Sequence, residues 1–99
     1  MTKEEVKELL TEKGFKFIKG REFDAILPLK NGNAIIVNVT IKDETLKGQI
    51  DGKEVLKFPN DRYELILRAK DKVVSTKSGF SLDNLESDIN SFKELNNSL

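Results

Sequence analysis

Apolar and polar residues alternate through the middle of this chain, whereas both ends show the three- to four-residue spacing of helices. The alternating sets are Phe23, Ala25, Leu27 and Leu29, then Ile35, Val37, Val39 and Ile41, then Tyr63, Leu65, Leu67 and Ala69. Alternation of period two is typical of strands with one buried face. We therefore predict strands here. The segment 34–41 is the predicted central strand, because Ala34 and Ile36 add apolar character to its second face.

The first terminal helix is predicted over residues 3–13. Thr2 and Glu5 form a capping-box pattern at its start, and Gly14 is a typical C-terminal stop. Its apolar stripe consists of Val6, Leu9 and Leu10.

The second terminal helix is predicted to begin at Ser81 as its cap. Its apolar stripe consists of Leu82, Leu85, Ile89 and Phe92. We expect the polar tail at 96–99 to fray.

The hairpin around Asn31 and Gly32 has two plausible registers. A two-residue loop would pair Leu27 with Ile36 and mix the faces of the two strands. A three-residue loop over 31–33 pairs Leu27 with Val37 and keeps one face apolar, so we predict this register. It requires Asn33 to adopt a left-handed conformation, which asparagine tolerates.

Further turns at Asp51-Gly52 and Lys70-Asp71 add strands to the sheet. Because every connection is short, the strands must be antiparallel and largely sequential. We predict a single α+β domain over residues 1–99. Its antiparallel meander of five to seven strands is flanked by an N-terminal and a C-terminal helix on one face. A small closed barrel is the alternative architecture.

The composition removes several classes of function. The chain has no Cys, His or Trp, and its 17 basic and 17 acidic residues cancel. These counts argue against thiol or histidine chemistry, a soft-metal site and a globally basic nucleic-acid binder. Without cysteines, a secretory signal or a long apolar segment, we expect a cytoplasmic protein that does not enter membranes.

Carboxylates are the main residues left for catalysis. Asp24, Glu54 and Glu64 could supply a glycosidase-like pair, but their places among alternating residues indicate a solvated sheet face. The acidic run at 83–88 is attributed to the favourable charge at a helix N-terminus. We expect no enzyme activity, no cofactor and no metal ion.

One segment interleaves basic and aromatic side chains. Its candidate binding residues are Lys13, Phe15, Lys16, Phe17, Lys19 and Arg21. Rings that stack on bases and cations that meet phosphates are what a single-strand binding platform needs. The string 13–18 is similar to the RNP1 motif of cold-shock and RNA-recognition-motif proteins. The similarity covers six residues, and a helix stands where those families have a strand, so it does not assign the chain to either.

A second basic group surrounds the predicted last turn: Arg68, Lys70, Lys72 and Lys77. The first three of these are further candidate binding residues. If the last hairpin lies near the first strand, the two basic groups would merge into one face. More often such lysines act as solubility devices and guards of edge strands.

These observations favour a small non-enzymatic module that binds another protein, such as a regulator, an inhibitor or an immunity-type protein. The Lys- and Asn-rich composition is compatible with an origin in a phage or mobile element. The alternative is a single-stranded nucleic-acid-binding protein that uses residues 13–21. On a regular strand Phe15 and Phe17 share a face, so both are expected inside or both exposed. We expect both inside, with Lys16 outside.

Overall fold

The computed structural model describes residues 2–20, 23–41, 43–50, 53–59, 61–79 and 82–99, and the side chains of all of these except 43–59. The elements in chain order are α1 (Lys3–Glu12), β1 (Lys16–Phe17), β2 (Asp24–Pro28), β3 (Ala34–Thr40), β4 (Asp43–Ile50), β5 (Lys53–Pro59), β6 (Arg62–Ala69), β7 (Lys72–Gly79) and α2 (Leu85–Asn97). Short 3₁₀ turns occupy Lys30–Gly32 and Leu82–Asn84.

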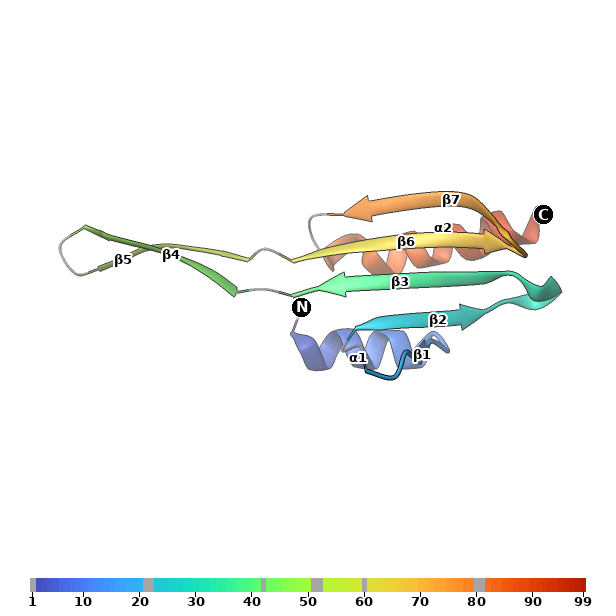
Figure 1. The fold of residues 1–99 in the computed structure, drawn as a ribbon, viewed down its shortest axis with the longest axis horizontal. Helices are drawn as coiled ribbons and strands as arrows, with labels where there is room; N and C mark the ends of the chain where they lie inside the picture. Colours follow the sequence, from blue (N-terminus) through green and yellow to red (C-terminus); the bar gives the residue numbers. More distant parts are fainter. Residues whose placement is uncertain (1, 21–22, 42, 51–52, 60, 80–81) are drawn as a thin grey trace.

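The α+β fold is confirmed: an antiparallel five-stranded sheet in the order β1-β2-β3-β6-β7 lies with α1 and α2 behind one face (Figure 1). β3 is the central strand, as predicted. β4 and β5 form a separate two-stranded ribbon that extends past the end of the sheet, between β3 and β6 in the chain (Figure 1). The prediction that these two strands join the sheet is wrong, because β3 pairs directly with β6. The predicted turn at Asp51-Gly52 lies outside the described residues. The five-stranded sheet ends at β1 and β7, so it is open and not a closed barrel. Neither helix in the described part of the chain is long and apolar enough to cross a membrane.

The core lies between the sheet and the two helices. β2, β3 and β6 contribute every second residue to this core, and Phe23 is buried just before β2. The predicted core residues are all buried: Phe23, Leu27, Val37, Val39, Leu65 and Leu67. The helices contribute Val6, Leu9 and Leu10 from α1 and Leu85, Ile89 and Phe92 from α2. Leu82, in the turn before α2, is buried as well. The predicted apolar stripes are therefore confirmed as one continuous core.

The capping box and the glycine stop predicted for the first helix are both present at α1. The Thr2 hydroxyl accepts a hydrogen bond from the Glu5 amide, and the Glu5 carboxylate accepts one from the Thr2 amide. Gly14 then adopts a φ of +93°, which a side chain would disfavour, and the Phe15 amide donates to the Leu10 carbonyl. This stop turns the chain so that Phe15 enters the core.

The predicted register of the β2–β3 hairpin is wrong by two residues. Leu27 lies opposite Ile35 and Ala25 opposite Val37, because the loop is longer than predicted and contains a 3₁₀ turn. Asn31 and Gly32 adopt the positive φ values, whereas Asn33 is extended. A shift of two residues preserves the face of every side chain, so the core assignment survives.

Asn33 has a different role from the one predicted. Its buried side-chain amide donates to the Asn96 side-chain oxygen of α2 at 2.7 Å. α2 starts at Leu85 with Asn84 as its N-cap, later than the predicted start at Ser81, which lies outside the described residues. The helix continues through Asn97 and so includes the first two residues of the tail 96–99 that we expected to fray. The contact of Asn96 with the β2–β3 turn holds this end of the helix in place.

Candidate functional site

Among the described residues, both helices lie on one face of the sheet and neither covers the other face. Strand register arranges the side chains of this outer face in rows. Directly paired residues of neighbouring strands share a face. The central row on this outer face consists of Lys16, Ile26, Ile36, Ile66 and Thr76. The three isoleucines are half-buried, and they lie side by side on β2, β3 and β6. They form an aliphatic strip across the middle of a surface that the rest of the described chain leaves open.

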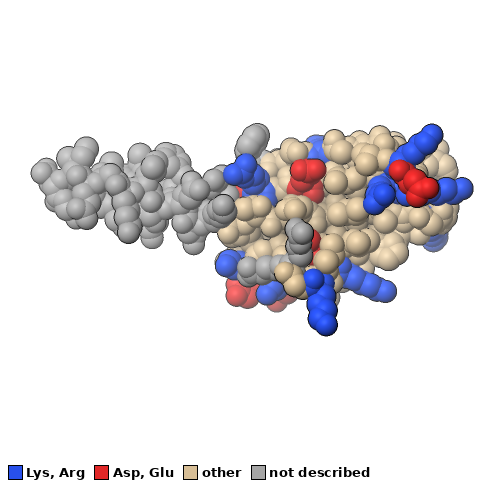
Figure 2. All heavy atoms as spheres, in the orientation of Figure 1, with Lys and Arg blue, Asp and Glu red and all other residues tan. Residues whose placement is uncertain are grey.

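Two further rows flank this isoleucine strip. On one side lie Asp24, Asn38, Glu64 and Ser78, and on the other lie Pro28, Ala34, Arg68 and Val73. Figure 2 shows the same face in space-filling form, with a largely uncharged middle and charged groups gathered toward its ends. The outer face is therefore apolar at its centre and charged at its margins, which is the usual distribution in protein–protein interfaces.

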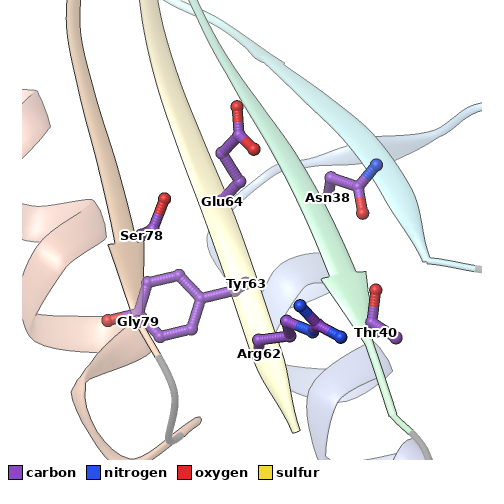
Figure 3. A pocket seen from close by; sticks show the side chains of 7 residues that line it. All are labelled: Asn38, Thr40, Arg62, Tyr63, Glu64, Ser78 and Gly79. Atoms are coloured by element: carbon purple, nitrogen blue, oxygen red, sulfur yellow. The ribbon is translucent and has the colours of Figure 1, made fainter.

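A small pocket of about 280 Å³ opens where β3 and β6 meet the root of the β4–β5 ribbon. It is lined by Asn38, Thr40, Arg62, Tyr63, Glu64, Ser78 and Gly79. In Figure 3 the Arg62 side chain extends toward Thr40, and the Tyr63 ring extends to the side where Gly79 lies. Its volume is below the roughly 300–1,000 Å³ of typical ligand sites, so we treat it as the polar end of the outer face.

Under the pocket, on the helix-covered side, Tyr63, Lys77 and Asp88 form a polar cluster. The Tyr63 hydroxyl donates to one oxygen of Asp88, and the Lys77 ammonium lies 2.6 Å from the other. Asp88 is only 4% exposed, whereas about half of the Lys77 side chain is exposed. A Cβ at Gly79 would overlap the Tyr63 ring, so glycine allows the ring to cross β7 toward α2. The cluster fastens α2 to β6 and β7.

The pKa values of the cluster follow from its contacts. Burial alone opposes ionisation of Asp88, but hydrogen bonds from Lys77 and Tyr63 and the positive charge of Lys77 outweigh it. Together they hold the pKa of the carboxyl below its usual value. Burial, and then the hydrogen bond and negative charge of Asp88, raise the pKa of Tyr63, which stays a protonated donor. The arrangement is that of a structural clamp.

The clamp makes the stability of the fold sensitive to acid. Because the folded pKa of Asp88 is depressed, its contribution is complete above the unfolded pKa and disappears as the pH falls through the folded pKa. Asp88→Asn should cost about 1.5–3 kcal/mol at neutral pH, the range for hydrogen bonds to charged groups. The difference from the wild type should shrink below about pH 4. Urea unfolding from pH 7 to pH 2.5 measures it, and a constant difference would contradict this role of Asp88.

The structure separates the residues of the basic–aromatic segment. Phe15 is buried at 5% exposure, whereas Phe17 is 38% exposed at the β1 edge, so the expectation of equal burial is wrong. Phe17 is opposite Ala25 and shares its face, but it lies on the outermost strand of the sheet. Lys16 is exposed as expected and points to the outer face, opposite Ile26.

The two remaining described cations of this segment, Lys13 and Lys19, have different surroundings. Lys13 reaches α2, with its ammonium 3.3 Å from the Glu86 carboxylate and 3.2 Å from the Asn90 oxygen. Lys19 is exposed in the loop after β1, and Arg21 lies outside the described residues. Lys13 thus links the two helices instead of extending toward a ligand.

The second basic group does not merge with the first. Arg68, Lys70 and Lys72 are exposed at the β6–β7 turn, while the basic–aromatic segment borders β1. β1 and β7 are the opposite edges of the sheet. The condition for a joint basic face, a last hairpin close to the first strand, is therefore not met, because the strand order places the two groups at opposite edges of the sheet.

The candidate carboxylates are also dispersed. Asp24 and Glu64 lie on the outer face on either side of Asn38, and the side chain of Glu54 lies outside the described residues. Within the described part of the chain, no three acidic groups gather to hold a metal ion.

Two features escaped sequence reasoning. Asp88 belongs to the acidic run that we attributed to the helix dipole, yet it lies three residues after Leu85 and four before Phe92, on the buried stripe. That spacing was an available signal. The isoleucine strip had a weaker signal, since Ile26, Ile36 and Ile66 occupy the nominally polar positions of three alternating strands.

Comparisons of the chain with protein-family models, with curated proteins and with solved structures found no match.

Proposed function

We propose that this chain is a protein-binding module, not an enzyme, and that the outer face of its sheet is the binding surface. The observation that supports this most is the isoleucine strip on the face opposite the helices. Aliphatic side chains gathered on an uncovered sheet are costly to leave in water and are typical of interaction surfaces. A role as a regulator, an inhibitor or an immunity-type protein fits such a surface, and the cysteine-free sequence fits the cytoplasm.

Binding of single strands has weaker support. Stacking requires exposed rings, and the described residues of the outer face include Ile26, Ile36 and Ile66 but no aromatic side chain. Phe15 is in the core. Phe17 is exposed at the sheet edge, and this exposure is the observation that favours the alternative.

The test of the proposed function compares Ile36→Lys with the control Ser91→Lys. Ile36 is on the outer face, and Ser91 is exposed on α2, away from the uncovered face. Tagged wild type and both variants are incubated with extract of the source cells, and retained proteins are measured by quantitative mass spectrometry. We expect a protein, either foreign or an untagged copy of the chain, to be retained by wild type and control but reduced about tenfold or more on Ile36→Lys.

Two results would contradict the proposal. The same proteins could be retained by all three baits while circular dichroism shows that every variant is folded. Alternatively, the wild type could bind a labelled single-stranded oligonucleotide at physiological salt, with the binding abolished in Phe17→Ala and weakened steeply by added salt.

A further inference from the structure

The outer face has a charge pattern that is complementary to itself. On β6 the outward residues are Arg62, Glu64, Ile66 and Arg68. Glu64 and Arg68 carry opposite charges and lie two positions before and two positions after Ile66, about 7 Å away on either side. Both are exposed, and neither makes an ion pair with a described residue of its own chain. Their charges are available to a partner.

A second copy can be placed over the outer face by a twofold axis that lies between the two sheets. The axis passes above Ile66 and runs across the strands, along the isoleucine strip. It places Ile26, Ile36 and Ile66 of one copy against the same residues of the other. It also brings Glu64 of each copy opposite Arg68 of its partner, which gives two equivalent ion pairs. Such an interface is isologous, the kind found in most soluble homodimers.

We propose that the partner of the outer face is a second copy of this chain, packed face to face as a two-sheet sandwich; this proposal rests on the proposed function. Packed sheets lie about 10 Å apart, which Glu and Arg side chains together can span. Packed sheets are usually rotated by about 30° relative to each other. For a charged residue about 7 Å from the axis, this rotation is a sideways displacement of about 3.5 Å, which an arginine side chain can span. The zero net charge of the chain removes long-range repulsion between copies.

The size of the face sets the strength of the dimer. The five strands span about 19 Å, and the four outward positions of β6, from Arg62 to Arg68, span about 20 Å along the strand. This footprint is smaller than the roughly 800 Å² per partner of a standard stable interface. The dimer should therefore be reversible, with association visible between about 10 μM and about 1 mM chain.

Reversal of single charges provides a sharp test. In Glu64→Arg, every intermolecular pair becomes two arginines, and in Arg68→Glu every pair becomes two glutamates. Each variant alone should dimerise about tenfold more weakly than the wild type, or worse, because like charges face each other. In an equimolar mixture, the introduced arginine of one chain faces the introduced glutamate of the other, so a heterodimer should form. The double variant Glu64→Arg/Arg68→Glu should recover wild-type association.

Sedimentation velocity over this concentration range measures association, and circular dichroism confirms that each variant is folded. The proposal is overturned by a wild type that stays monomeric at about 1 mM or by single variants that dimerise like the wild type. It is also overturned if the equimolar mixture of the two single variants associates no more strongly than either variant alone. If the wild type is monomeric but captures a foreign protein, and Ile36→Lys abolishes that capture, the homodimer proposal fails while the proposed protein-binding function stands. If neither association nor capture depends on the outer face, both proposals fail.

Discussion

Replacement of Val37 by aspartate is expected to unfold this domain, or to leave it mostly unfolded at room temperature. Val37 is fully buried on the central strand, between Ala25 on β2 and Leu65 on β6. An aspartate there would lose its hydration without gaining a partner, because the residues opposite it on both sides are apolar. Burial of an unpaired ionised group costs several kcal/mol, which is comparable to the roughly 5–15 kcal/mol that stabilise a domain of this size.

The neighbouring residue provides the control. Asn38 follows Val37 on the same strand, but its side chain is exposed on the outer face. Asn38→Asp introduces the same charge one position away, opposite the acidic Asp24 and Glu64. Because the site is exposed to solvent, this like-charge contact should lower the melting temperature by only a few degrees. Thermal unfolding followed by circular dichroism compares the variants. A Val37→Asp protein that melts within a few degrees of the wild type would refute the assignment of the core face.

Truncation of Phe92 to alanine is expected to destabilise the fold by about 3–5 kcal/mol, the usual cost of removing a large aromatic ring from a core. The ring is 5% exposed and belongs to the same buried cluster as Leu85 and Ile89 of α2. Because Phe92 is covered within a single chain, the loss should appear as a lower urea midpoint of the monomer. It should be independent of protein concentration.

Leu95 on the same helix is the matched control for this truncation. It is 39% exposed, so Leu95→Ala should cost well under half as much as Phe92→Ala. If the apolar stripe of α2 instead served to dock a partner, Phe92→Ala would leave the urea midpoint of the monomer unchanged and would abolish association. Urea unfolding and light scattering of the two variants distinguish these outcomes.

The proposed dimer interface and the core use opposite faces of the sheet. Val37→Asp acts on the helix-covered face, whereas Ile36→Lys and Glu64→Arg act on the outer face. Alternation along β3 and β6 thus allows stability and association to be altered independently. A variant of the outer face that loses association but keeps the wild-type melting temperature would demonstrate this separation directly.

The periodicity of the chain determined the elements and the core. Period-two alternation decides which side chains share a face of a strand, and this property survives a register shift of two residues, as the β2–β3 hairpin shows. The same local character explains why the Thr2 capping box and the Gly14 stop were predictable. Their hydrogen bonds and backbone angles involve residues close together in the chain.

Tertiary structure decided the features that depend on distant parts of the chain. The long β2–β3 loop is held by Asn33 and Asn96, which are 63 residues apart, and no local pattern encodes that contact. The clamp at Asp88 joins three elements, because Tyr63 lies on β6, Lys77 on β7 and Asp88 on α2. Its contacts form only where these elements pack together. The isoleucine strip became a surface because both helices occupy the other face. A sequence specifies apolar positions, but which of them stay uncovered depends on where every other element packs.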